Sequence, residues 1–248
     1  MFDGPTVIKV GGSLFDWPEL IPTLRRFLAA FRRPILVPGG GPVADMIRNV
    51  DRTHGLGAES AHWLAVRAME LNGHWLIRLL NASKALPGRA GPACHEMPHA
   101  LPGCRREWNA GRVPLIDAWA FCRADERRVG ALPHDWSATS DSIAARVAEC
   151  FRADDLWLLK STDPASQMSV REAALRGLID PTFPVIVERT LAARARLCIR
   201  VLNLRSWNPE AAGSVLRVEP HGADRSCCRA YRRGRQRRAR QSIPLAGT

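Results

Sequence analysis

The sequence predicts an α/β fold, in which a mostly parallel central sheet is covered by helices on both faces. Short apolar segments alternate with segments of helical hydrophobic spacing, which is the pattern of a parallel sheet. Two of the apolar segments run directly into glycine turns, as strands of such sheets often do before the next helix. The chain has 248 residues, 46% of them hydrophobic, which is enough for one sizeable core.

The first part of the chain predicts two strand-to-helix units followed by a long helix. Leucines at helical spacing define the first helix, and the second strand leads into a triple glycine. The long helix carries Gly73, where we expect a kink or a break. The predicted elements are strand 6–10, helix 18–31, strand 34–38, helix 43–50 and helix 58–80.

The second part is less regular. Residues 82–112 are rich in proline and glycine and predict loops, with a hairpin as one option. Ser140 and Asp141 give the following helix a favourable first turn. The further predicted elements are strand 113–121, helix 140–150 and strands 156–159, 197–202 and 214–218.

The net charge of +12 is concentrated at one end of the chain. Residues 223–248 contain eight arginines against one aspartate, which leaves only +5 for the preceding 222 residues. We therefore expect this tail to be disordered, and expect the body not to bind nucleic acid. The tail has two explanations: a shifted reading frame late in the gene, or an appendage that binds nucleic acid or an acidic partner in a salt-dependent manner.

Cysteine usage and hydropathy predict a cytoplasmic location. The seven cysteines are scattered without a CxxC pair, unlike the disulfide framework of a secreted domain. No apolar run approaches the roughly 18 residues of a membrane helix, and the N-terminal segment lacks the features of a secretory signal.

Two glycine turns are the strongest chemical signals. KVGGS at 9–13 places an ammonium group beside backbone amides that no Cβ shields, and GGG at 39–41 follows the second strand. Lys9 is one of only three lysines in a chain that otherwise uses arginine, the others being Lys84 and Lys160. Neither turn fits the Walker or dinucleotide pattern, and either could be a simple strand-to-helix connection. Together they favour a phosphate-binding site.

In combination and order, these motifs resemble the amino acid kinase family. The resemblance rests on KVGGS at 9–13, PGGGP at 38–42, TSDSIAA at 139–145 and LLKSTD at 158–163, and covers about residues 5–222. It implies a three-layer sandwich of the carbamate kinase-like type. It also implies an amino acid kinase domain over 1–222, with the acceptor side up to about residue 150 and the nucleotide side over 151–222. The sequences of segments 61–65, 136–145 and 177–184 are most similar to those of an aspartokinase-related subgroup linked to methanofuran-type one-carbon metabolism.

The resemblance implies ATP-dependent phosphoryl transfer without a covalent intermediate, with Mg²⁺ arriving on the nucleotide. Lys9 would neutralise the transferring phosphoryl group, Asp141 would orient the lysines by ion pairing, and Lys160 would reach the nucleotide phosphates. The remaining nucleotide or phosphate contacts would come from Gly11, Gly12, Ser13, Ser161 and Asp163. The acceptor would be held by Gly39, Gly40, Gly41, His62 and Ser137. The resemblance also implies a homo-oligomer, since relatives are usually dimers or larger.

Each role has a structural alternative. Lys9 could be a solvated residue at a strand end, and Asp141 could cap its helix. Ser13 could also be a cap, whereas His62 could be a core residue and Lys84 a surface one. Asp45 and Arg48 could line the acceptor pocket or face solvent.

Two features depart from the pattern or compete with it. Ser137 stands where the subgroup often has an acid or an amide, so the acceptor is open, and the closing strand of the family is replaced by the arginine-rich tail. A zinc site formed by Cys94, His95, His99 and Cys104 is not expected, because the spacing matches no standard motif.

The predicted function is therefore a kinase that phosphorylates a small anionic acceptor, either a phosphate monoester or a carboxylate. Our specific expectation is an aminomethyl-furan methyl phosphate. The alternatives are a kinase of an amino acid or of another phosphate monoester, and a nucleotide-binding regulatory protein without activity. No membrane partner is expected.

Overall fold

A computed structural model describes residues 4–82, 96–163, 168–194 and 197–208, together with the backbone of 216–219. The predicted arginine-rich tail and Lys84, Cys94 and His95 lie outside these residues. Within them, no helix is both long enough and sufficiently apolar to cross a bilayer.

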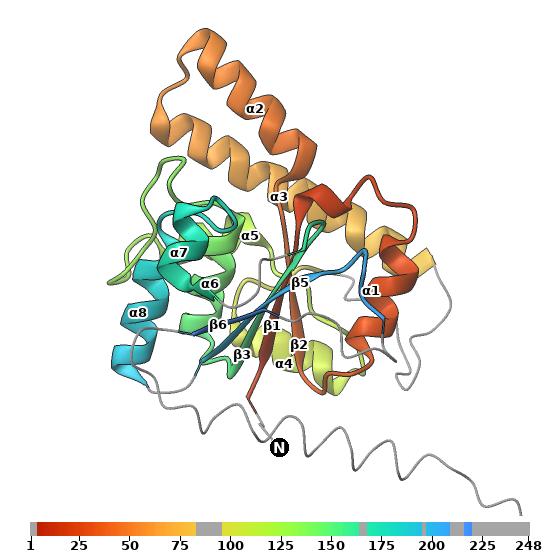
Figure 1. The fold of residues 1–248 in the computed structure, drawn as a ribbon. Helices are drawn as coiled ribbons and strands as arrows, with labels where there is room; N and C mark the ends of the chain where they lie inside the picture. Colours follow the sequence, from red (N-terminus) through yellow and green to blue (C-terminus); the bar gives the residue numbers. More distant parts are fainter. Residues whose placement is uncertain (1–3, 83–95, 164–167, 195–196, 209–215, 220–248) are drawn as a thin grey trace, which may run out of the picture.

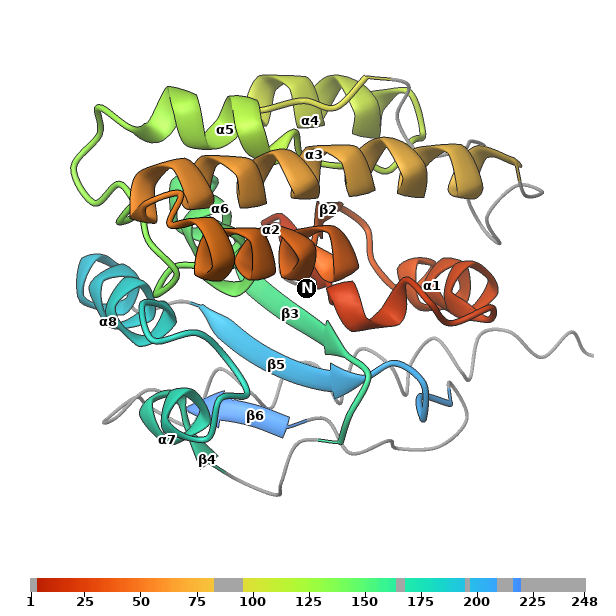
Figure 2. The same ribbon diagram turned by 90° about the horizontal axis from the view of Figure 1, so that it is seen from above.

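The described chain forms a six-stranded sheet in the order β2-β1-β3-β5-β6-β4 (Figures 1 and 2). The first four of these strands are mutually parallel, β5 and β6 are antiparallel, and β6 and β4 are parallel. This confirms the prediction of a mostly parallel central sheet. The strands are β1 (Thr6–Val10), β2 (Pro34–Pro38), β3 (Asp155–Lys160), β4 (Met168–Ser169), β5 (Cys198–Asn203) and β6 (Leu216–Glu219).

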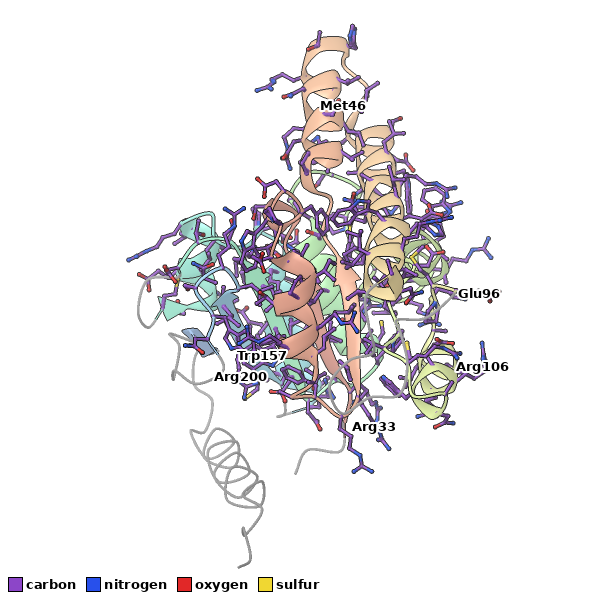
Figure 3. The ribbon with its side chains drawn as sticks, turned by 90° about the vertical axis from the view of Figure 1, so that its right-hand side faces the viewer. Arg33, Met46, Glu96, Arg106, Trp157 and Arg200 are labelled. Atoms are coloured by element: carbon purple, nitrogen blue, oxygen red, sulfur yellow. The ribbon has the colours of Figure 1, made fainter. Side chains whose placement is uncertain are left out.

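Helices cover both faces of the sheet and complete three layers (Figure 1). The helical elements in chain order are the 3₁₀ turn η1 (Gly12–Leu14), α1 (Leu20–Leu28), α2 (Gly41–His54), α3 (Ala58–Ala82), α4 (Leu101–Asn109), α5 (Ala118–Asp125), α6 (Ser140–Cys150), α7 (Val170–Leu175) and α8 (Phe183–Ala193). Helix α2 buries no side chain completely and projects with the start of α3, and its Met46 is 58% exposed (Figure 3).

Alternation along the strands divides the buried side chains into two cores, because successive residues of a strand face opposite sides of the sheet. On β1, Val7 belongs to the core under α5, α6 and α8, whereas Ile8 and Val10 belong to the core under α1 and the second half of α3. On β3 the same alternation separates Leu158 from Trp157. The Trp157 ring lies 5.0 Å from the guanidinium carbon of Arg200 on the next strand (Figure 3).

Most predicted elements are confirmed, and α6 begins and ends where the sequence placed it. The predicted strand over 113–121 is wrong. Val113 and Leu115 are bridge residues and not part of a strand, Leu115 bridges to Leu36, and α5 begins at Ala118. The run of apolar residues is compatible with either structure, and Asp117 decides for the helix because its side chain accepts a hydrogen bond from the Ala120 N–H (2.8 Å).

Two further expectations are corrected. The proline- and glycine-rich stretch contains α4, in which Pro102 occupies the first turn, where a proline costs no hydrogen bond. Helix α3 continues through Gly73 without a break. The missing side chain is needed for packing instead, since a Cβ at Gly73 would lie 2.6 Å from Met97 Sδ and 3.0 Å from Leu115 Cδ2.

Candidate active site

The two glycine turns lie against each other at one edge of the sheet. Val10 is paired with both Pro38 and Leu159, so the loops after β1, β2 and β3 leave the sheet at the same level. A Cβ at Gly12 would come 2.3 Å from the backbone N and Cα of Gly41, and Gly41 has φ +53°. Both positions therefore require glycine, and their backbone amides are brought to one place.

Lys9, Asp141 and Lys160 form a cluster beside these turns. Lys9 lies on the same face of the sheet as Val7, and Lys160 on the same face as Leu158, so both lysines face α6. Asp141 is in the first turn of α6. Its Oδ1 is 2.9 Å from Lys9 Nζ, and its Oδ2 accepts a hydrogen bond of 2.6 Å from Lys160 Nζ. One carboxylate thus fixes two ammonium groups.

The cluster is buried, and burial controls its charges. The side chains of Lys9, Asp141 and Lys160 are 5%, 6% and 15% exposed. Burial lowers the pKa of Lys9 from its ordinary value, and Lys160 lowers it further, while Asp141 opposes both effects. Burial alone would raise the pKa of Asp141, but the two lysines outweigh it and bring the pKa to about 2. Asp141 is therefore a carboxylate at neutral pH, and it supplies the countercharge of the lysines.

Asp180 holds the N-terminal end of α6 in place. Its carboxylate accepts hydrogen bonds from the Thr139 N–H (2.9 Å) and hydroxyl (2.7 Å), from the Ser142 N–H (2.9 Å) and hydroxyl, and from the Phe183 N–H (3.0 Å). The interpretation of Asp141 as a helix cap is wrong, because Thr139 occupies the cap position and Asp180 accepts from the Ser142 N–H of that turn.

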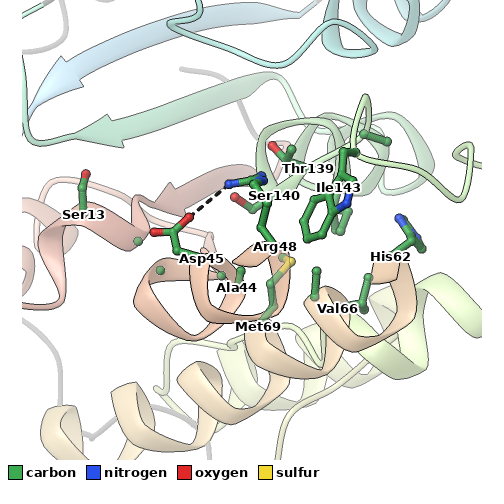
Figure 4. A pocket seen from close by; sticks show the side chains of 16 residues that line it. Ser13, Ala44, Asp45, Arg48, His62, Val66, Met69, Thr139, Ser140 and Ile143 are labelled. Carbon is green, nitrogen blue, oxygen red and sulfur yellow. Dashed lines mark hydrogen bonds and ion pairs between the residues drawn. The ribbon is translucent and has the colours of Figure 1, made fainter. Parts of the chain in front are cut away.

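A pocket of about 220 Å³ opens between α2, α3, α6 and the glycine turns (Figure 4). Its glycine wall consists of Gly12, Gly40 and Gly41, and its apolar wall includes Val66, Met69 and Ile143. The pocket therefore combines backbone amides on one side with a surface suited to carbon atoms on the other. The other residues that line it are Ser13, Ala44, Asp45, Arg48, His62, Ala65, Trp136, Ala138, Thr139 and Ser140.

The charged side chains of the pocket lie at its rim. The Arg48 guanidinium carbon lies 4.4 Å from the centre of the Trp136 ring, and an Arg48 N–H group donates a 3.1 Å hydrogen bond to Asp45 (Figure 4). Trp136 Nε1 donates to Asp51 Oδ2 at 2.8 Å, which ties the tryptophan to α2. Asp45 and Arg48 therefore border the pocket and also face solvent, their side chains being 69% and 46% exposed, so the structure agrees with parts of both sequence interpretations.

Two side chains outside the glycine turns are predicted to bind the acceptor, and only one of them, His62, lines the pocket, whereas Ser137 does not. His62 lines the pocket, is 3% exposed and stacks on His134 with ring centres 5.2 Å apart. Burial, followed by the charge of His134, lowers the pKa of His62, which favours its neutral form. The Ser137 side chain is not part of the lining. Its hydroxyl is 3.0 Å from the Thr182 hydroxyl, and its neighbours Trp136 and Ala138 line the pocket instead.

Of the residues predicted to bind nucleotide, Gly11, Gly12 and Ser13 follow β1, whereas Ser161 and Asp163 lie on the loop after β3. Ser161 donates a 2.8 Å hydrogen bond to the Ser13 hydroxyl, and Asp163 accepts one of 3.1 Å from Ser206. Arg205, which the sequence analysis did not select, donates to the Ser13 carbonyl (3.0 Å) and to Asp16 (2.7 Å). These contacts connect the nucleotide-side loops to η1.

Gly11 and Gly39 support the turns through their backbones. The Gly11 N–H donates to the Leu159 carbonyl and the Gly39 N–H to the Val10 carbonyl, each at 2.9 Å. Asn72, on α3, was also not selected from the sequence. Its Nδ2 donates to the carbonyls of Gly39 (2.8 Å) and Gly40 (2.7 Å). The only available signal was a polar residue on the buried face of a helix.

Within the described residues, no group of three or more histidine, cysteine or acidic side chains could hold a metal ion. Of the four residues weighed for zinc, Cys94 and His95 lie outside the described part, and Cys104 is fully buried in the core. Asp141 is already paired with two ammonium groups. The described residues therefore offer no resident metal site.

Known proteins resemble this chain in sequence and in fold. The family model of the amino acid kinase family matches residues 4–164. A [5-(aminomethyl)furan-3-yl]methyl phosphate kinase of Methanocaldococcus jannaschii is 21% identical over an alignment of 195 residues, and the match covers 74% of this chain and 82% of the relative.

The solved structures with a similar fold include uridylate kinases. That of Archaeoglobus fulgidus has a TM-score of 0.53 at 21% identity, covering 80% of this chain and 90% of its own. That of Bacillus anthracis has a TM-score of 0.55 at 13% identity, covering 83% and 88%. The family match spans well over half of the sequence and includes both glycine turns and the Lys9–Asp141–Lys160 cluster. The chain belongs to the amino acid kinase family.

Proposed function

We propose that the protein transfers the γ-phosphoryl group of ATP to a small anionic acceptor bound in the pocket between α2, α3 and α6. The observation that carries this proposal is the pair of ammonium groups that one buried carboxylate fixes beside two touching glycine turns. Phosphoryl transfer needs positioning and charge neutralisation more than covalent chemistry, and these groups can supply both.

Lys9 is the proposed catalytic cation, and Asp141 its positioning partner. A carboxylate with a pKa of about 2 is a poor proton acceptor at neutral pH, so we assign Asp141 no role as a general base. An acceptor that is already an anion needs none. Lys160, on the same carboxylate, is assigned to the nucleotide phosphates.

The proposed nucleotide contacts are the amide of Gly12 and the side chains of Ser13, Ser161 and Asp163. The Gly11 N–H, which the sequence also predicts to bind nucleotide, already donates to the Leu159 carbonyl. Because the described residues form no acidic cage, the residues present do not fit a resident Mg²⁺ ion. Any Mg²⁺ that takes part would be held by the nucleotide phosphates, and we assign this chain no step that uses it.

The acceptor site is assigned to the amides of Gly40 and Gly41 at the N-terminus of α2, where the helix dipole favours an anion. Neutral His62 and the apolar wall would contact the rest of the molecule. Our specific acceptor is an aminomethyl-furan methyl phosphate, a proposal supported by the kinase from Methanocaldococcus jannaschii. The second candidate is another phosphate monoester, favoured by the uridylate kinases among the similar folds.

The test is a panel of acceptors that includes the furan methyl phosphate, UMP and several amino acids, with ADP formation as readout. We expect one phosphate monoester to be turned over, and Lys9→Met, which keeps the length of the side chain, to reduce kcat at least 100-fold. Circular dichroism and thermal unfolding should show that this variant remains folded. Unchanged turnover by Lys9→Met would contradict the proposal. Tight ATP binding without a product from any acceptor would favour a regulatory nucleotide-binding protein instead.

A further inference from the structure

Asn72 is a buried polar side chain that contacts the acceptor loop although it lies 32 residues further along the chain. It is 8% exposed and sits on α3, beside the backbone of the triple glycine. Its Nδ2 donates one hydrogen bond to the Gly39 carbonyl and one to the Gly40 carbonyl, at 2.8 and 2.7 Å. Since both partners can only accept, the orientation of the carboxamide is determined.

These two hydrogen bonds also determine where two N–H groups point. The Gly39 carbonyl belongs to the same peptide unit as the Gly40 N–H, and the Gly40 carbonyl to the same unit as the Gly41 N–H. In a trans peptide the C=O and N–H groups point in opposite directions, and the structure contains no cis peptide in its described part. Both N–H groups are therefore turned away from Asn72.

The side to which they turn is the side of the other glycine turn. The Gly41 nitrogen faces Gly12, because a Cβ placed on Gly12 would lie 2.3 Å from it. Within the described residues, neither the Gly40 N–H nor the Gly41 N–H donates a hydrogen bond to the protein. The two donors are thus oriented and free. Donation from Asn72 to the carbonyl of each unit also polarises its N–H group, which strengthens it as a donor.

Gly73 allows Asn72 to reach the loop. A side chain at Gly73 would collide with Met97 and Leu115, so its absence lets α3 pack closely at this point. The Gly40 carbonyl meanwhile accepts a second hydrogen bond, of 3.2 Å, from the Ala44 N–H of α2. Asn72 therefore connects α3 to the first turn of α2.

We propose that Asn72 is a positioning residue for the acceptor, and that its carboxamide aims the N–H groups of Gly40 and Gly41 at the acceptor anion. This inference rests on the proposed function, since it takes this loop as the acceptor site. Asn72 itself touches no substrate. Its loss should therefore weaken acceptor binding more than it slows the chemical step.

The experiment follows sulfate binding by the ¹H–¹⁵N NMR signals of Gly40 and Gly41. Sulfate keeps its charge between pH 5 and 8, and the measurement does not depend on kinase activity. In the wild-type protein we expect both signals to shift with sulfate. In Asn72→Leu the sulfate Kd should rise at least tenfold. Leu76→Val, a conservative apolar change at a fully buried position one turn along α3, should leave the Kd within twofold of wild type.

A second variant separates orientation from packing. Asn72→Asp has nearly the same shape but loses both donors when ionised, so its sulfate Kd at pH 8 should also rise at least tenfold. Lowering the pH to 5 protonates part of the introduced carboxyl group, which restores one donor, and the Kd should fall toward the wild-type value. A purely structural role of Asn72 gives no such pH profile. In activity assays, the acceptor KM should rise at least tenfold while kcat changes less than threefold.

The outcomes separate this inference from the proposed function. Equal sulfate affinity in wild type, Asn72→Leu and Asn72→Asp would overturn the role of Asn72 and leave the kinase proposal intact. If the NMR signals of Gly40 and Gly41 do not shift when sulfate is added to the wild-type protein, both the acceptor site and the role of Asn72 would be overturned. The expected sulfate results without turnover of any acceptor would support Asn72 as part of an anion site but contradict the kinase proposal.

Discussion

The acceptor side and the nucleotide side of the site are built from contacts of very different burial. On the acceptor side, Lys9, Asp141 and Asn72 are between 4% and 8% exposed, and so is Asp180, which reaches α6 from the C-terminal half of the chain. On the nucleotide side, the loops after β3 and β5 reach η1 through exposed side chains, as in the pair of Arg205 and Asp16, which are 40% and 74% exposed. The first set is fixed when the core forms, whereas solvent competes for the second.

The energetic consequence follows from the surroundings of each charge. Removing one partner of a buried ion pair leaves a charge without compensation and costs about 3–5 kcal/mol. An exposed pair contributes about 0–1 kcal/mol. If the comparison is correct, substitutions of the buried residues should lower the free energy of unfolding. Substitutions of the exposed residues on the nucleotide side should change only the affinity for nucleotide.

The largest effect is expected from Asp141→Asn. This change leaves Lys9 and Lys160 facing each other without a countercharge, so the free energy of unfolding should fall by about 3 kcal/mol. Because the lysines lose their orientation, kcat should fall at least 100-fold. Urea unfolding and steady-state kinetics measure the two effects. The control is Glu172→Gln on α7, whose pair with Arg176 is exposed and should cost less than about 1 kcal/mol.

Asp180→Ala should follow, with a loss of about 2–4 kcal/mol. The substitution removes the acceptor of five donors at the N-terminal turns of α6 and α8. Asp180→Asn keeps one oxygen acceptor and should lose less. Thermal unfolding of both variants checks the order. Equal melting temperatures for Asp180→Ala and wild type would show that these buried hydrogen bonds contribute no more to stability than the exposed contacts do.

Acidification should release the stabilisation that Asp141 contributes. Its pKa in the folded protein, about 2, lies below the ordinary value of 3.8, so folding favours the charged form. The contribution is present above about pH 4 and is lost as the pH falls toward 2, and it amounts to about 2 kcal/mol. Comparing wild type with Asp141→Asn at pH 5 and pH 2.5 isolates it from other carboxylates. The difference in unfolding free energy between the two proteins should shrink at the lower pH.

The smallest effect is expected from Arg205→Ala. Its hydrogen bonds to the Ser13 carbonyl and to Asp16 are exposed, so the free energy of unfolding should change by less than about 1 kcal/mol. Nucleotide affinity, measured by calorimetry, should fall only a few-fold. A loss of stability as large as that of Asp180→Ala would erase the contrast between the two sides.

The parts of the fold that the sequence predicted correctly are those with a strong local signal. The strands β1, β2, β3 and β5 are short apolar runs between turn residues, and α6 has favourable first-turn chemistry. Helix α5 was mistaken for a strand because an apolar run has no distinguishing period. Helices α7 and α8 are not among the elements that the sequence predicts.

The site divides in the same way. Lys9, Lys160 and the glycine turns can be found from the sequence, because lysine is rare in this chain and consecutive glycines are easily recognised. Ser137 was selected by its position in a motif, yet its hydroxyl faces Thr182, 45 residues away. Asn72 and Asp180 act on segments more than 30 residues distant, and their own neighbours in sequence give no sign of it.

The amino-acid sequence by itself determined the parallel sheet and the residue types at the ends of its strands, because hydrophobic period and glycine turns act over a few residues. The tertiary structure alone decided that Asp141 pairs with both lysines, that Asp180 rather than Asp141 holds the start of α6, and that Asn72 orients the triple glycine. The physical reason is that a buried polar group must find its partner wherever packing places one, and the distance along the chain carries no information about that.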